Sequence, residues 1–233
     1  IPRRPNFIML ALKLGLPLVS TRPLGAWSPD DESSLVAWYQ KGEGITLNIA
    51  SVSQWADSSS NSYDMVQATA LEQPEYSAGV LTFNPGDVSN LQTTGQISIT
   101  DEFTIGIVLQ PIAINTTVLG DNTSAGEFFK VQTSSTLRIK IDNNQVELSL
   151  DSGTLIEAQY LVLTRNSSDL LTLYKDGVAQ ADTETVAGTA DIDTIGVRKT
   201  DLNPYSGTIS EIQIYNSTSA DLTANVNDRL AGL

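Results

Sequence analysis

The chain has 233 residues and contains neither cysteine nor histidine. It can therefore form no disulfide or thiolate metal site, and it lacks the imidazole needed for a Ser-His-Asp triad and for most zinc sites. Its net charge of −14 at pH 7 argues against binding nucleic acid through the acidic surface, because phosphate contacts need lysine and arginine. The length accommodates one β-domain with an N-terminal segment, or two domains.

The first 25 residues differ from the rest of the chain in charge and hydropathy. They hold four basic residues, no acidic residue and a dense apolar run from Phe7 to Val19, whereas the rest holds nine basic residues against 27 acidic ones. Large exposed apolar patches usually mark contacts, and a difference in charge sign between segments is typical of interaction tails. We therefore predict that residues 1–31 form an N-terminal assembly arm with a polar linker.

The apolar run also has features of two membrane-related segments. A transmembrane helix needs about 20 apolar residues, whereas this run is shorter and is interrupted by Lys13 and Pro17, so no membrane association is predicted. A secretory signal peptide is the other alternative, because Arg3 and Arg4 precede the run as in an n-region. Pro17 and the lack of a clear small-x-small cleavage site count against a signal peptide.

The arm could pack on its own body or insert into another subunit, and we favour the second arrangement. Its arginines would then pair with acidic groups on a shell or on a second copy of this chain. Because the acidic body itself offers such groups, we expect a homo-oligomer. The predicted partner-binding residues are Arg3, Arg4, Phe7, Leu10, Leu12, Leu14, Leu16, Arg22 and Trp27.

From Leu35 onward the pattern predicts β-structure almost throughout, because short runs rich in β-branched and apolar residues alternate with clusters of Gly, Asn, Asp and Ser. The expected strands are Leu35–Gln40, Tyr63–Ala68, Val80–Phe83, Phe103–Gln110, Glu127–Gln132, Leu137–Ile141, Val146–Leu150, Tyr160–Thr164, Leu170–Lys175, Thr194–Val197 and Gly207–Tyr215. Alternation is clean in residues 137–141 and 209–214, so these strands should bury one face and leave the other in water.

Turn and capping residues add detail to this pattern. Asn143-Asn144 and Asp176-Gly177 each separate two expected strands and predict tight hairpin turns. Near the C-terminus, Ser219 is a suitable N-cap, and Leu222, Val226 and Leu230 recur on one helical face. The sequence therefore predicts an all-β antiparallel sandwich or jelly roll followed by one short C-terminal helix.

Six short motifs, in order, resemble the concanavalin A-like (laminin G-like) jelly-roll family. They are Trp38-Tyr39 closing the first strand, the Trp55–Ser62 loop with Asp57 and Asn61, Leu81-Thr82-Phe83, Leu173–Gly177, Ile195–Arg198 and Gly207–Asn216. The resemblance covers residues 32–233 and implies that this region is one jelly-roll domain. The chain lacks both glycines of the family's Ser-Gly-Asn-Gly loop, so we expect Asn61 to take over the positive φ angle.

The resemblance also guides the search for enzymatic and calcium sites. Glycoside hydrolases of this fold carry Glu-x-Asp-x-Glu on one strand, where alternation places the acids on one face. That motif is absent, Asp191 and Asp193 being the nearest pair, so no enzymatic activity is predicted.

Calcium is a candidate ligand, because several aspartates lie in expected loops. No cofactor is predicted, however, since no loop is dense in acidic residues and Asp57 and Asp176 are suited to stabilising turns. The candidate oxygen ligands are Asp57, Asp121, Asp176, Asp193 and Asp201.

Aromatic side chains are the candidates for glycan binding. Trp38 and Trp55 occupy positions that are core positions in the family, and Trp27 in the linker suits an anchor against a neighbour. Tyr205, in a polar loop, is the best candidate for an exposed aromatic side chain.

An apolar N-terminal arm joined to this jelly roll resembles structural proteins of tailed-bacteriophage virions. We therefore predict a capsid decoration protein, located on the capsid surface or the tail, that binds the major capsid protein or another virion subunit through its arm. The alternatives are a glycan-binding module of a head fibre or tail that adsorbs to a host surface glycan, and a secreted adhesin domain whose first 25 or so residues are cleaved.

Overall fold

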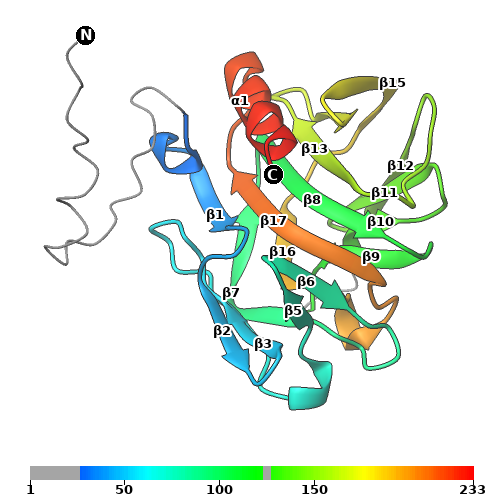
Figure 1. Ribbon diagram of the computed structural model, residues 1–233. Coiled ribbons are helices and arrows are strands. Elements are labelled where there is room, and N and C mark those ends of the chain that lie inside the picture. The colour runs from blue at the N-terminus through cyan, green and yellow to red at the C-terminus, as the bar shows by residue number, and fades with distance from the viewer. Residues whose placement is uncertain (1–26, 123–126) are drawn as a thin grey trace, which may run out of the picture.

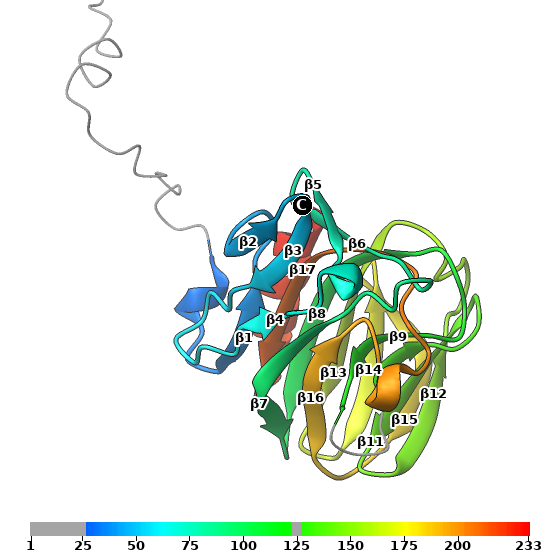
Figure 2. The same ribbon diagram turned by 90° about the horizontal axis from the view of Figure 1, so that it is seen from below.

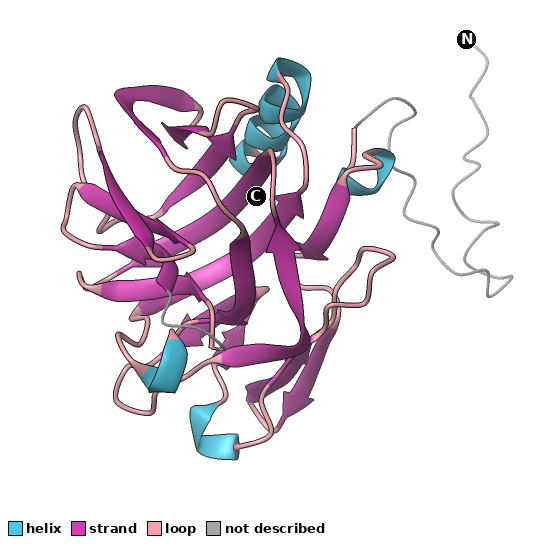
Figure 3. Cartoon of the chain, turned by 180° about the vertical axis from the view of Figure 1, so that it is seen from behind, coloured by secondary structure: helices cyan, strands magenta, loops and turns pink. Residues whose placement is uncertain are grey.

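The computed structural model describes residues 27–122 and 127–233, and the side chains of residues 127 and 128 lie outside that description. Nearly all regular structure is antiparallel β-strand, with three short 3₁₀ turns and one C-terminal α-helix (Figures 1 and 3). The all-β prediction with one terminal helix is confirmed. No helix among the described residues is long and apolar enough to cross a bilayer. Of the predicted partner-binding residues, all except Trp27 lie outside the described residues, as does most of the predicted arm.

The chain forms seventeen strands within the described residues. They are β1 (Leu35–Tyr39), β2 (Ile45–Asn48), β3 (Ser51–Trp55), β4 (Met65–Val66), β5 (Glu75–Ser77), β6 (Val80–Phe83), β7 (Leu91–Ile99), β8 (Phe103–Pro111), β9 (Thr116–Gly120), β10 (Glu127–Val131), β11 (Thr136–Ile141), β12 (Asn144–Ser149), β13 (Gln159–Arg165), β14 (Leu170–Lys175), β15 (Val178–Thr185), β16 (Ala190–Ile195) and β17 (Gly207–Tyr215). The remaining elements are η3 (Pro29–Asp31), η4 (Ala70–Glu72), η5 (Lys199–Asp201) and α1 (Ala220–Ala231).

The sheet folds back on itself so that two layers face each other (Figures 1 and 2). In one layer β17 pairs with β8, β8 with β13, β13 with β14 and β14 with β15. In the other, β7 pairs with β16, β16 with β9, β9 with β10, β10 with β11 and β11 with β12. Strands β3 to β6 connect the layers at one side.

The main core fills the space between these layers. It contains the inward-facing side chains of the central strands, such as Ile105 and Ile107 of β8 and Leu161 and Leu163 of β13. Alternation along β11 follows the prediction, because Leu137, Ile139 and Ile141 are buried while the residues between them are half-buried.

The prediction of a wet face is wrong for β17. Glu211 and Gln213, which alternate with the core residues Ile212 and Ile214, are both 0 % exposed. The reason is tertiary: α1 packs over the outer face of β8 and β13, and Arg229 of α1 bonds Glu211 of β17. Figure 1 shows the helix lying across these strands.

The predicted C-terminal helix is confirmed together with its cap. The Ser219 hydroxyl accepts a hydrogen bond of 3.0 Å from the Leu222 N–H, as an N-cap residue does. Leu222, Val226 and Leu230 are buried on one face and form, with Val162 and Tyr215, the helix cluster. This second apolar cluster lies on the outer side of the β8–β13–β17 layer.

The predicted turns are partly confirmed. Asp176 and Gly177 join β14 to β15, both with positive φ angles of 49° and 79°, as a type I′ hairpin requires. The β11–β12 turn is shifted by one residue, because Ile141 pairs with Asn144 and leaves Asp142 and Asn143 at the tip.

The loop with the lost glycines also differs from the prediction. The positive φ of 61° falls at Ser62 and not at Asn61. The Asn61 side chain is committed elsewhere, because its amide donates to the backbone carbonyls of Leu35 and Val36.

Strand prediction failed where strands are polar or contain glycine. Six strands were not predicted: β2, β3, β5, β7, β9 and β15. The expected strand at residues 63–68 is reduced to the two residues of β4. Strand β15 is rich in Ala, Thr, Asp and Glu, residues of low β-propensity apart from Thr, and forms because the Asp176-Gly177 turn brings it against β14.

Candidate functional site

Tyr205, the predicted exposed aromatic candidate for glycan binding, is buried, and the prediction is wrong. The residue is 0 % exposed, its hydroxyl donates to the Thr208 carbonyl at 3.2 Å, and its ring meets Phe83 edge to face at 5.7 Å. Burial raises the pKa of its phenol well above the ordinary value. The polar loop around Tyr205 indicates a surface position, but the Tyr205 N–H donates to the Gly196 carbonyl and the side chain belongs to the main core.

Trp38 and Trp55 occupy the core positions that were predicted for them. Trp55 is fully buried and packs at a tilt against Tyr39, with ring centroids 5.6 Å apart. Trp38 is 6 % exposed and donates its indole N–H to Glu211 at 2.9 Å. Neither ring is available as a platform for a ligand.

A polar network around the buried Glu211 carboxylate fixes α1 to the sheet. This carboxylate accepts hydrogen bonds from the Arg229 guanidinium at 2.7 Å, from the Gln213 amide at 2.9 Å and from the Lys41 N–H at 3.0 Å, in addition to the Trp38 indole. The Arg229 guanidinium also lies 4.8 Å from the centre of the Trp38 ring. Four donors around one carboxylate offset the cost of burying its charge.

Trp27 packs against the chain's own body. It contacts the helix cluster and donates its indole N–H to Glu32 at 2.8 Å. The adjacent Ser28 and Pro29, expected in a solvated linker, are buried. A pocket of about 390 Å³ includes Trp27, Asn225, Asp228 and Arg229 in its wall. The folded body thus includes residues 27–31, and binding of a partner by Trp27 stays a prediction.

An uncharged groove lies where the start of α1 meets β13 and β14. Its volume is about 280 Å³, and nine described residues line it, none of them charged. Most of the lining is polar: Thr164, Asn166, Thr172, Tyr174, Thr218, Ser219 and Thr223. We call this feature the hydroxyl groove. The lack of charge in this groove contrasts with the acidic composition of the chain, which has 27 acidic residues.

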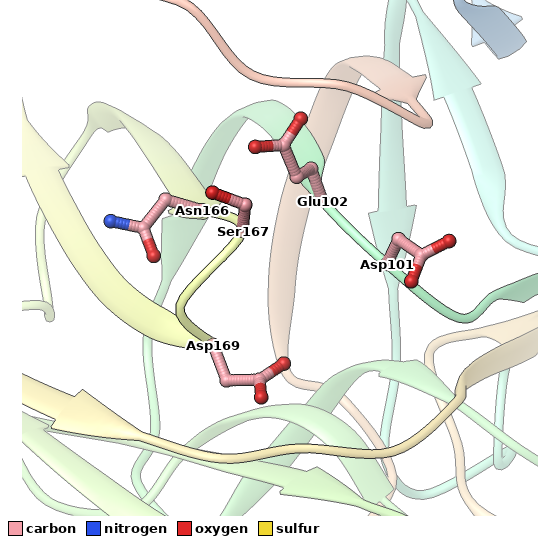
Figure 4. Close-up of a pocket in the computed structure, with 5 residues that line it drawn as sticks. All are labelled: Asp101, Glu102, Asn166, Ser167 and Asp169. Carbon is pink, nitrogen blue, oxygen red and sulfur yellow. The ribbon is translucent and has the colours of Figure 1, made fainter.

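An acidic pocket of about 270 Å³ lies nearby, between the β7–β8 turn and the β13–β14 turn (Figure 4). It is lined by Asp101, Glu102, Asn166, Ser167 and Asp169. Beside it the fully buried Arg165 donates to the carbonyls of Ile99, Asp101 and Gly188. Burial lowers the pKa of Arg165, while Asp169 and Asp101 oppose the decrease. These carboxylates therefore serve as counter-charges to a buried guanidinium.

The predicted calcium ligands lie apart in the structure. The Asp57 carboxylate accepts from the N–H groups of Trp38, Ser59 and Tyr63, and Asp176 accepts from the Tyr160 N–H, so both stabilise turns as predicted. Burial raises the pKa of Asp193, whose carboxylate accepts from the Asn122 N–H at 2.6 Å. Within residues 27–122 and 127–233, no three acidic side chains gather as a metal site would require.

Comparison with known proteins shows similarity at the level of fold. No family model and no curated protein matches the sequence. Among solved structures, Trypanosoma rangeli sialidase in complex with sialic acid aligns with a TM-score of 0.58 and 15 % identity over 86 % of this chain and 33 % of that chain. The binding domain of Paraclostridial Mosquitocidal Protein 1 aligns with a TM-score of 0.55 and 14 % identity over 87 % of this chain and 52 % of that chain. This chain thus spans about a third of the sialidase chain and about half of the mosquitocidal-protein chain. The similarity concerns the fold alone.

Sequence reasoning missed the hydroxyl groove. Its residues come from positions 164–174 and 218–223, which are distant along the chain. Each threonine taken alone suits a strand or a helix start. The signal in the sequence was limited to two short runs without charge, Asn166-Ser167-Ser168 and Asn216-Ser217-Thr218-Ser219, in an acidic chain.

Proposed function

We propose that this chain is a non-enzymatic structural protein of a virion, a capsid decoration protein whose N-terminal arm binds another virion subunit. Its body would be a concanavalin A-like (laminin G-like) jelly roll that faces outward. One observation carries the proposal: the basic and apolar residues 1–25 are joined to a body with nine basic and 27 acidic residues. A protein that binds only the assembled shell stabilises that shell by mass action.

The arm predicts a salt-dependent and apolar interaction. Full-length protein should co-sediment with the particles it decorates, and deletion of residues 1–25 should abolish co-sedimentation while circular dichroism still reports a folded β-protein. Replacement of Arg3, Arg4 and Arg22 by glutamate should weaken binding and reduce its dependence on salt, because exposed charges are screened at high ionic strength. The exposed Lys199 provides the control, since Lys199→Glu should bind as the unaltered protein does. Full binding by the deletion variant would refute the role of the arm.

Glycan binding is the second candidate function, and the hydroxyl groove favours it. The groove is large enough for one sugar ring and presents neutral groups that can donate and accept hydrogen bonds. As a module for host adsorption, the protein should bind immobilised oligosaccharides. A glycan array probed with the full-length chain tests this function independently of particle binding.

A further inference from the structure

We infer that the hydroxyl groove is a binding site for a neutral saccharide, an inference that rests on the second proposed function. The site combines β13 and β14 with the first turn of α1. Both walls are fixed by the fold: β13 and β14 pair through five residues, and the helix start is held by the Ser219 cap. The site thus needs little ordering on binding, which favours affinity.

The polar groups of the groove are free to bind a ligand. The hydroxyls of Thr172, Tyr174, Thr218 and Thr223 have no hydrogen-bond partner among the described residues. Asn166 uses its carbonyl oxygen to accept from Ser168 and Leu170, but its amide group donates to no described residue. Several unpaired donors and acceptors therefore line one small groove.

The chemistry of these groups selects the class of ligand. A phosphate or carboxylate would need arginine or lysine, and a divalent cation would need carboxylates, whereas none of the nine described lining residues is charged. A hydroxyl both donates and accepts, so threonine and tyrosine hydroxyls match those of a sugar. The Tyr174 ring, half-buried against the helix cluster, adds an apolar surface for the C–H face of a sugar ring.

The test uses the full-length chain on an array of neutral and sialylated oligosaccharides, followed by titration calorimetry with the best neutral one. We expect binding of a neutral saccharide with a dissociation constant of about 1 mM, as for a small ligand in an open site. The affinity should not change between low and high salt, because no charge takes part. A sialylated saccharide should bind no better than its neutral parent.

The groove variant is Thr172→Val combined with Tyr174→Phe, which removes two hydroxyls and keeps the shape of both side chains. It should weaken saccharide binding by at least about tenfold without lowering the melting temperature, because neither hydroxyl has a described protein partner. The matched control is Thr82→Val with Tyr76→Phe, on β6 and β5; neither residue lines the groove, and Figure 1 shows both strands away from the start of α1. The control should bind as the unaltered chain does.

The outcomes separate the site from the function. Saccharide binding that the groove variant leaves unchanged would overturn the site but leave glycan binding in place. Binding only of sialylated saccharides, lost at high salt, would likewise overturn the neutral site. No saccharide binding at all would overturn both the site and the second proposed function, while the role of the arm would be untouched.

Discussion

The main core and the helix cluster lie on opposite faces of the same strands, yet they are built differently. The main core is a continuous apolar layer between two halves of the sheet. Among the described residues the helix cluster holds five buried side chains, and it depends on polar anchors beside it, above all the Glu211 network and the Ser219 cap. Strands β8, β13 and β17 therefore separate an apolar core on one side from an outer face that is partly apolar and partly polar.

This comparison predicts unequal costs for the same truncation on the two faces. Leu163→Ala should destabilise the protein by about 4 kcal/mol, because the side chain is 0 % exposed between two sheet layers that cannot close the cavity. Leu230→Ala should cost about 2 kcal/mol, since a surface helix can move inward to fill part of the space. Urea unfolding of both variants measures the difference. Equal costs would show that the helix is held as rigidly as the core.

Loss of the Glu211 network should have the next largest effect on stability. Glu211→Ala should destabilise the protein by about 3 kcal/mol, because it leaves the Arg229 charge, the Trp38 indole and the Lys41 N–H without their acceptor. The double variant Glu211→Met with Arg229→Met should cost less than the sum of its single variants. Additive costs in this double-mutant cycle would mean that the pair does not act as one unit.

Close packing of the helix on the sheet tests the outer face directly. A Cβ atom at Gly106 would lie 2.7 Å from Val226 and 2.9 Å from Leu230, so Gly106→Ala should cost about 2 kcal/mol as the helix shifts outward. Gly95→Ala is the control, because its Cβ would meet Tyr63 at 3.4 Å, an ordinary contact distance. Thermal denaturation compares the two variants. Similar melting temperatures would indicate that the helix seat tolerates an added methyl group.

The helix cap gives the smallest effect. Ser219→Ala removes the acceptor for the Leu222 N–H and should cost about 1 kcal/mol. Hydrogen exchange should then be faster in α1 but unchanged in β8, because the main core does not depend on this cap. Faster exchange throughout the sheet would instead show that the stability of the main core depends on the helix.

Local chemistry in the sequence determined many elements of this fold. The Asp-Gly pair at 176–177 predicts its hairpin because both residues tolerate positive φ, and Ser219 with three spaced apolar residues predicts α1. The alternation in residues 137–141 predicts the buried face of β11. The core positions of Trp38 and Trp55 followed from the resemblance to the jelly-roll family, and the turn-stabilising role of Asp57 followed from its loop. None of the three lines the hydroxyl groove.

Only the tertiary structure decided which faces are covered. Alternation in β17 shows that Glu211 and Gln213 share a face, but whether water reaches that face depends on α1 and on β1, whose Trp38 lies 173 positions from Glu211. The burial of Tyr205 and the joining of uncharged residues from two distant segments in the hydroxyl groove have the same origin. Patterns of residues report neighbours two to four positions apart, whereas burial is set by segments that the chain brings together from a distance.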